Sequence, residues 1–274
     1  MKLSFVQPRA ELRPYVKSIW ICKSEAGMPI SGNNIAAPNG CPKIIINIEN
    51  SIISTAGGVT YKSKEHEIYF AGSRDIPVQI TTSSRKTIFI GIEFYPHGAY
   101  PIFGIPSFEI TNSLLPVNII WERGEKNLSE IFWNKEGLKD KIDFIQERLV
   151  NNLTEKPRDN LLIEYCIKTL SSSNGLMEIS RLEQMTGYSR RYLEILFKIH
   201  VGFTPKSLAG IFRFQKFYSA WASGKSYSDL VYDLNNYYFD QSHFIKEFKR
   251  MTGFSPKHFS NKISNEFGRQ LTLH

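Results

Sequence analysis

Short apolar runs separated by turn-forming residues dominate the first 123 residues. Four of these runs are rich in β-branched and aromatic residues, and they cover 44–48, 67–71, 78–81 and 87–94. Clusters such as Pro38-Asn39-Gly40 and Ala56-Gly57-Gly58 lie between them. Several short strands with such turns are typical of a β-sandwich or a barrel, so we expect a β-rich N-terminal half.

The apolar spacing becomes helical from about residue 124. Leu138, Ile142, Ile145 and Leu149 recur at intervals of three and four residues, with charged residues between them. This pattern predicts an amphipathic helix whose apolar edge resembles two heptads of a coiled coil. Two heptads leave two readings open. The edge either packs against its own domain or forms the seam of a homodimer.

A polar, proline-containing segment at 151–157 separates this helix from another, at about 159–170. Such segments are typical of linkers. We therefore expect three parts: a β-rich sensor or dimerisation domain at 1–150 ending in the amphipathic helix, a linker at 151–160, and a helical domain at 161–274.

The helical part contains an internal repeat. The segment 197–206 recurs 51 residues later as 248–257, and both copies share the pattern F-K-x-x-x-G-F-[ST]-P-K. A repeat indicates one supersecondary unit used twice, and stacked arrays need roughly three or more units. Two units at a fixed separation suit a ligand that is itself periodic, and duplex DNA is the obvious candidate.

Each copy predicts a helix-turn-helix unit. In the first copy, Gly187 allows a tight turn after a short helix, and Ser189 can cap the next helix by accepting from its free N–H groups. Asp240 stands at the same place in the second copy. Two sets of apolar residues form the predicted inner faces: Leu193, Leu196, Phe197 and His200, then Phe244, Phe248 and Met251. A long helix from Pro205 to about Ala222 would join the two units.

Positive charge is concentrated in the half with the repeat. Residues 1–155 hold 17 Lys+Arg and 16 Asp+Glu, whereas residues 156–274 hold 17 Lys+Arg and 10 Asp+Glu, a net of +7. A basic domain attracts polyanions, although a solvated basic surface is the alternative.

Composition is ordinary for a folded protein, with 42% hydrophobic and 22% charged residues. No apolar run reaches the ~20 residues of a membrane helix, and the N-terminus lacks the pattern of a signal peptide. The three cysteines, Cys22, Cys41 and Cys166, form no metal-binding or disulfide pattern. We expect a cytoplasmic protein that does not enter the membrane.

The repeat resembles the AraC/XylS family of bacterial transcription regulators, over about 174–262. The second copy carries the resemblance most clearly, with Asp240-Gln241-Ser242-His243-Phe244, Phe248-Lys249, Gly253 and Ser255-Pro256-Lys257-His258-Phe259. The resemblance implies a seven-helix domain with two helix-turn-helix units, whose recognition helices (about 189–200 and 240–251) enter successive major-groove segments. One departure is that Asn235-Asn236-Tyr237-Tyr238 replaces the glycine of the second turn.

By position, the resemblance implies two sets of DNA-contacting residues. The candidates for base contacts are Arg190, Arg191, Glu194, Ile195, Gln241, Ser242 and Lys246. The candidates for phosphate contacts are Ser189, Lys198, Lys206, Asp240, Lys249 and Lys257. Arg suits guanine and Gln suits adenine, whereas Lys beside the backbone positions the protein without reading sequence. Glu194 could equally be a solvated helix charge.

The N-terminal half is similar, more weakly, to the cupin-like sensor domains fused to such modules, through Phe94-Tyr95-Pro96-His97-Gly98 and Pro38-Asn39-Gly40. The predicted fold is therefore α+β: a β-rich, cupin-like domain with helices, followed by an all-α domain with two helix-turn-helix motifs joined by a linker helix. The candidates for a ligand pocket are Trp20, Phe94, Tyr95 and His97. His66 and His97 alone are too few for a metal centre before residue 200, so we expect no metal and no cofactor.

We therefore expect a transcription regulator and not an enzyme; it is assigned as an activator, with repression as the open alternative. Its expected partners are double-stranded DNA, a second copy of the chain, RNA polymerase and a small-molecule effector. Two alternatives stay open. One is a DNA-modifying enzyme such as an alkyl-repair protein, which would need a reactive cysteine. The other is a regulator whose N-terminal half is an interaction domain without a ligand.

Overall fold

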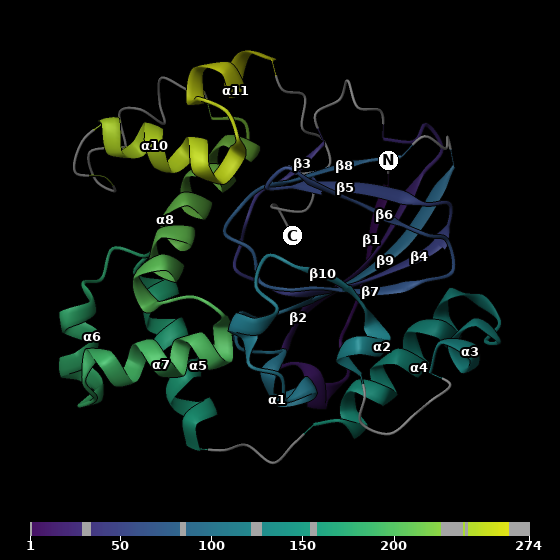
Figure 1. Ribbon diagram of the computed structural model, residues 1–274, viewed down its shortest axis with the longest axis horizontal. Helices are drawn as coiled ribbons and strands as arrows, with labels where there is room; N and C mark the ends of the chain where they lie inside the picture. Colours follow the sequence, from purple (N-terminus) through teal and green to yellow (C-terminus); the bar gives the residue numbers. More distant parts are fainter. Residues whose placement is uncertain are drawn as a thin grey trace.

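The computed structural model describes residues 2–28, 34–82, 86–121, 128–153, 158–225, 238 and 241–262 (Figure 1). It consists of a β-rich N-terminal half and a helical C-terminal half, each with its own apolar core. The α+β fold class expected from the sequence is confirmed, with a β-rich half followed by a helical half. The turn residues Asn235–Tyr237 and the predicted cap Asp240 lie outside the described residues.

Two antiparallel sheets form the N-terminal half. The larger has the strand order β1 (Lys2–Val6), β2 (Val16–Ser24), β9 (Thr87–Phe94), β4 (Lys43–Glu49), β7 (Ile68–Ala71) and β10 (Leu114–Pro116). The smaller has the order β3 (Ile35–Ala36), β8 (Val78–Thr81), β5 (Ile52–Ala56) and β6 (Val59–Ser63). The four apolar runs of the sequence correspond to β4, β7, β8 and β9.

The central strands of the larger sheet are buried on both faces, which explains their unbroken apolar runs. Ile44, Ile46 and Ile92 face a core shared with the helices, whereas Trp20 and Phe89 face the smaller sheet. In register, Trp20 pairs with Gly91, and a Cβ at Gly91 would lie only 2.0 Å from Cζ2 of Trp20. The absence of a side chain at Gly91 therefore lets the indole lie against the strand.

Short helices and one long helix cover the outer face of the larger sheet (Figure 1). They are α1 (Tyr100–Phe103), α2 (Val117–Ile120), α3 (Leu128–Trp133) and α4 (Gly137–Asn151), together with the 3₁₀ turns η1 (Ala10–Leu12) and η3 (Ser107–Glu109).

The apolar edge of α4 faces its own domain. Ile142, Ile145 and Leu149 are buried in the core beneath the larger sheet, and Leu138 packs against that core while half-buried. The dimer seam considered from the sequence is therefore wrong, because these side chains are already covered within the chain.

The C-terminal half is built from helices around one core. They are α5 (Arg158–Ser172), α6 (Ile179–Thr186), α7 (Arg190–Val201), α8 (Pro205–Ala222), α10 (Gln241–Thr252) and α11 (Pro256–Lys262). All of the predicted inner-face residues of α7 and α10 are buried. Among the described residues, no helix is both long and apolar enough to cross a membrane.

We expect Ile145→Ala to lower the free energy of unfolding by about 2–5 kcal/mol, because the fully buried side chain leaves a cavity. Chemical denaturation measures this loss. Leu161→Ala on α5 is the control, since Leu161 is 58% exposed and its truncation should cost less than about 0.5 kcal/mol. A loss that grew on dilution of the protein would restore a dimeric role for α4.

Candidate nucleic-acid interface and ligand pocket

The first helix-turn-helix unit consists of α6 and α7. Gly187 ends α6 with a φ of 74°, and its N–H donates to the carbonyl of Glu183. Ser189 caps α7 as the sequence predicts, because its Oγ accepts from the N–H of Tyr192 at 3.4 Å. The N–H of Arg190 donates to Oε1 of Glu183 at 2.6 Å, so a side chain of α6 also satisfies the start of α7.

The candidate base-contacting face of α7 is open to solvent. Arg190, Arg191 and Ile195 are exposed, while Glu194 is half-buried. Nε of Arg190 lies 3.0 Å from Oε1 of Glu194, so these two charges partly neutralise each other. Arg191 forms no hydrogen bond or ion pair with any residue that the structure describes. The guanidinium with the greatest freedom to engage a base edge is therefore that of Arg191.

The second unit presents α10 in a similar way. Gln241, Ser242, Lys246 and Lys249 are exposed, opposite the buried face of the helix. Tyr238 packs against Phe244, with ring centroids 5.1 Å apart, and is buried just before the helix begins. This contact holds the start of α10 against the core.

The helix α8 connects the two units, and Figure 1 shows α7 and α10 near its opposite ends. Thr204 caps it by accepting from the N–H of Ser207 at 3.1 Å, and Pro205 occupies its first turn. Nε of Arg213 lies 3.6 Å from Oε2 of the buried Glu247, which ties α8 to α10. The predicted phosphate contact Lys206 is exposed at the start of α8, as are Lys198 on α7 and Lys257 on α11.

The β half contacts the C-terminal ends of both candidate recognition helices. Oγ of Ser107 donates to the carbonyl of His200 at 3.0 Å, and the rings of Tyr100 and His200 lie 4.4 Å apart. Nη1 of Arg250 on α10 lies 3.0 Å from Oδ2 of Asp75. The N-terminal parts of α7 and α10, which carry the candidate base contacts, are left exposed.

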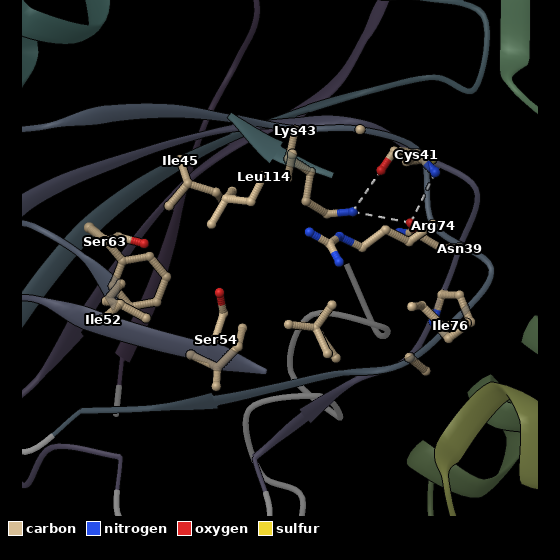
Figure 2. Close-up of a pocket in the computed structure, with 18 of the residues that line it drawn as sticks. Asn39, Cys41, Lys43, Ile45, Ile52, Ser54, Ser63, Arg74, Ile76 and Leu114 are labelled. Carbon is tan, nitrogen blue, oxygen red and sulfur yellow. Dashed lines mark hydrogen bonds between the residues drawn. The ribbon is translucent and has the colours of Figure 1, made fainter. Parts of the chain in front are cut away.

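A cavity of about 110 Å³ lies between the two sheets (Figure 2). Apolar side chains from both sheets line most of it, including those of Trp20, Ile45, Ile52, Ile80 and Phe89. Its polar lining includes Asn39, Lys43, Ser54, Ser63 and Arg74. Of the four pocket candidates from the sequence, Trp20 alone lines this cavity.

The prediction that Phe94 lines a ligand pocket is wrong. Its side chain lies in the core under the helices and lines neither the cavity between the sheets nor the larger pocket. Alternate residues of a strand point to opposite faces. On β9, Ile90, Ile92 and Phe94 share the helix-covered face, whereas Phe89 and Glu93 face the other way.

A larger pocket of about 770 Å³ lies between the β half and α5 and α8. Tyr95 and His97 line it, so the structure brings these two candidates together but separates them from Trp20. Glu93 lies at this pocket with Lys17 and Lys43, whose Nζ atoms are 2.8 and 3.3 Å from its carboxylate. Burial alone would raise the pKa of Glu93, but the two ammonium groups outweigh burial and hold it at about 2.

Sequence reasoning missed Lys43, Glu93 and Arg74. A single carboxylate inside the apolar run of β9 is a usable signal for Glu93, since a buried charge needs a partner. Nothing local marks Arg74, which follows β7 in a loop.

Two stretches of the chain match known family models. Residues 4–116 match a domain of unknown function, and residues 182–262 match a helix-turn-helix domain. No curated protein matches the sequence.

The similar solved structures share little sequence with this chain. A structure of ToxT from Vibrio cholerae is 13% identical, covers 90% of this chain and 100% of its own, and has a TM-score of 0.49. Unsaturated fatty acid-bound ToxT is 12% identical over 94% of this chain and 98% of its own, with a TM-score of 0.46. The cupin domain of Cnp3 from Schizosaccharomyces pombe is 10% identical over 34% of this chain and 63% of its own, with a TM-score of 0.27.

The capped helix pair α6 and α7, joined by α8 to a second exposed helix α10, together with the family match at 182–262, defines a DNA-binding protein of the helix-turn-helix class. Within that class, the match at 182–262 is to an AraC-type helix-turn-helix domain, in agreement with the resemblance found in the sequence.

We expect the free energy of unfolding to fall as the pH is lowered from about 6.5 to about 4, in part through His200. Burial lowers the pKa of this imidazole to about 4; Asp159 opposes the shift and His97 adds to it. In this window the unfolded chain binds a proton at His200 that the folded chain does not, so the unfolded state gains stability.

Denaturation of His200→Gln at several pH values tests this expectation, because the variant should show a flatter decline between about pH 6.5 and pH 4. Glu93 provides an internal control. Its lowered pKa of about 2 places its own loss of stability between about pH 4.5 and pH 2 in both proteins. Identical pH profiles from pH 7 to pH 4 would contradict the role given to His200.

Proposed function

We propose that the protein is a sequence-specific transcription regulator whose helices α7 and α10 enter successive major-groove segments of operator DNA. One observation supports this most strongly. Two helices joined by α8, of which α7 is capped by Ser189, both expose polar N-terminal parts, within a half of the chain that carries a net charge of +7. Free N–H groups at helix N-termini and exposed lysines favour phosphate contact.

Roles within this interface follow from exposure and chemistry. Arg191 and Gln241 are the proposed bidentate readers of guanine and adenine, with Arg190, Ile195, Ser242 and Lys246 beside them. Glu194 would accept from cytosine only by releasing Arg190, so we assign it to orienting that guanidinium. The proposed phosphate contacts are Ser189, Lys198, Lys206, Asp240, Lys249 and Lys257.

The N-terminal half is proposed as a sensor of a small ligand, because its two sheets enclose a cavity with polar and apolar walls. An unsaturated fatty acid is bound in one structure of ToxT, and a small effector is the corresponding proposal for this chain. Dissociation of the domain contacts at Ser107 and Asp75 would free the ends of both recognition helices.

We further propose a cytoplasmic, non-enzymatic regulator that acts on RNA polymerase and pairs with a second copy through a surface other than the apolar edge of α4. The three cysteines do not favour the alkyl-repair alternative. Burial raises the pKa of Cys22 to about 12 and those of Cys41 and Cys166 to about 11, which disfavours the reactive thiolate.

Footprinting on the promoter of the protein's own operon tests the proposal. We expect protected segments on one side of the duplex and an affinity that falls steeply with salt. An affinity that ignored DNA sequence and salt alike would overturn it.

Arg191→Ala should weaken operator binding by about 1–3 kcal/mol and relax preference at the base pairs that it reads, if the contact is bidentate. Competition titration against single-base operator variants measures both effects. Lys139→Ala on the exposed side of α4 is the control and should bind like the wild type. Weaker binding with unchanged base preference would show that Arg191 does not contact the bases.

Lys249→Ala should weaken binding to all DNA sequences comparably and reduce the slope of log affinity against log salt by about one unit. The measurement is a salt titration with operator and non-operator fragments. Lys64→Ala, which removes a 77% exposed charge from the β half, should leave the slope unchanged. A loss of affinity for operator DNA alone would show that Lys249 contacts bases and not only phosphates.

A further inference from the structure

The cavity between the sheets contains a positive charge that no residue in the described part of the chain neutralises. Nη2 of Arg74 donates to the carbonyl of Ser113 at 3.0 Å, whereas its Nη1 is buried without a hydrogen-bond partner. No Asp or Glu of the described residues forms an ion pair with Arg74. The undescribed parts of the two-sheet region, 29–33 and 83–85, contain neither residue type.

Two further polar atoms of the same cavity are buried without a partner among the described residues: Nε1 of Trp20 and Oγ of Ser54. Figure 2 shows the Arg74 guanidinium and the Ser54 hydroxyl directed into the cavity. Arginine and indole N–H groups can only donate, and a hydroxyl can do so as well. The unpaired groups therefore call for an occupant that accepts hydrogen bonds and carries negative charge.

Lys43 lies at the edge of the cavity but is already engaged. Its Nζ donates to Oδ1 of Asn39 at 3.1 Å and to the carbonyl of Cys41 at 3.0 Å, and it pairs with Glu93. Arg74 differs, because burial costs a charged group several kcal/mol unless a partner compensates. The guanidinium of Arg74 is therefore the group to which an anionic ligand would bind, and Lys43 adds to the positive potential beside it.

The rest of the cavity wall restricts the body of the occupant. Apart from the polar groups named above, Ile45, Ile52, Ile76, Val78 and Leu114 supply apolar surface. A volume of about 110 Å³ corresponds to roughly four water molecules at the volume that each occupies in the liquid, so the occupant is small. The occupant therefore has a short apolar body attached to one anionic group.

We propose that the cavity is the effector site and takes a small aliphatic monocarboxylate, bound at its carboxylate by Arg74, with Trp20 and Ser54 as further donors. This inference rests on the proposed role of the N-terminal half as a small-ligand sensor. It adds the class of ligand and the residues that select it.

Thermal unfolding of the full-length chain with hexanoate and its neutral analogue hexanamide tests the proposal. A ligand selective for the folded state raises the midpoint of unfolding as its concentration increases. We expect hexanoate to raise the midpoint in a saturable way and hexanamide to have no effect at equal concentrations. No response to hexanoate, or an equal response to both, overturns the proposal.

Variants locate the site. Arg74→Met should weaken hexanoate binding about tenfold or more, as expected for loss of a charge-assisted hydrogen bond. Without ligand, the midpoint of this variant should equal or exceed that of the wild type, because an unpaired buried charge is removed; a purely structural arginine would give a lower midpoint. Ser54→Ala should weaken binding to a smaller extent and keeps the charge, so it tests the site if Arg74→Met does not fold.

Arg13→Met is the matched control, because Arg13 lines the larger pocket between the two halves and not this cavity. It should retain the full response to hexanoate. A lost response in Arg13→Met, or a retained one in Arg74→Met, overturns the assignment. Because the measurement contains no DNA, its outcome is independent of operator binding by the same proteins, which tests the proposed function separately.

Discussion

The contact between the turn at Pro38–Gly40 and α8 joins the two halves of the molecule at the helix that connects α7 to α10. Nε2 of Gln215 donates to the carbonyl of Pro38 at 2.6 Å. Gly40 has a φ of +73°, and a Cβ there would lie 2.8 Å from Cδ1 of Leu208. Because α8 connects both helix-turn-helix units, a single turn of the β half is fixed against the element that sets their separation. Residues of that turn also line the cavity and the larger pocket, so the proposed ligand site adjoins the boundary with the helical half.

Glu93, at the larger pocket between the halves, and Arg74, in the cavity between the sheets, illustrate opposite consequences of burying a charged group. Glu93 is compensated by two lysines and an amide, and its ionised form is stabilised far below the ordinary pKa of a carboxylic acid. Arg74 has a backbone carbonyl as its acceptor, and burial lowers its pKa. A paired buried charge is compatible with a stable fold, whereas an unpaired one destabilises the folded protein until a ligand of opposite charge binds to it. The presence or absence of a charged partner therefore distinguishes the structural role of Glu93 from the binding role proposed for Arg74.

Local signals predicted the helical half well, because caps, glycine ends and apolar faces are encoded within a few residues of one another. Ser189, Thr204 and Gly187 do in the structure what their residue types indicate. The predictions that failed depended on partners distant in sequence. The side of β9 on which Phe94 lies is set by the pairing of β9 with β2 and β4, and the burial of Ile145 is set by the sheet that α4 covers. Arg74 has no local signature at all, since its importance comes from what surrounds it in the folded chain.

The burial of Ile35 has a consequence for how such chains can evolve. This residue belongs to the β half, yet it is packed into the core of the helical half, where it is 3% exposed. Ser107 and Asp75 add polar contacts across the same boundary. A chimera that joined this helical half to the sensor of another regulator would lose a core side chain and leave those polar groups without their partners. A working exchange of the β half by recombination therefore requires a donor whose boundary matches these contacts.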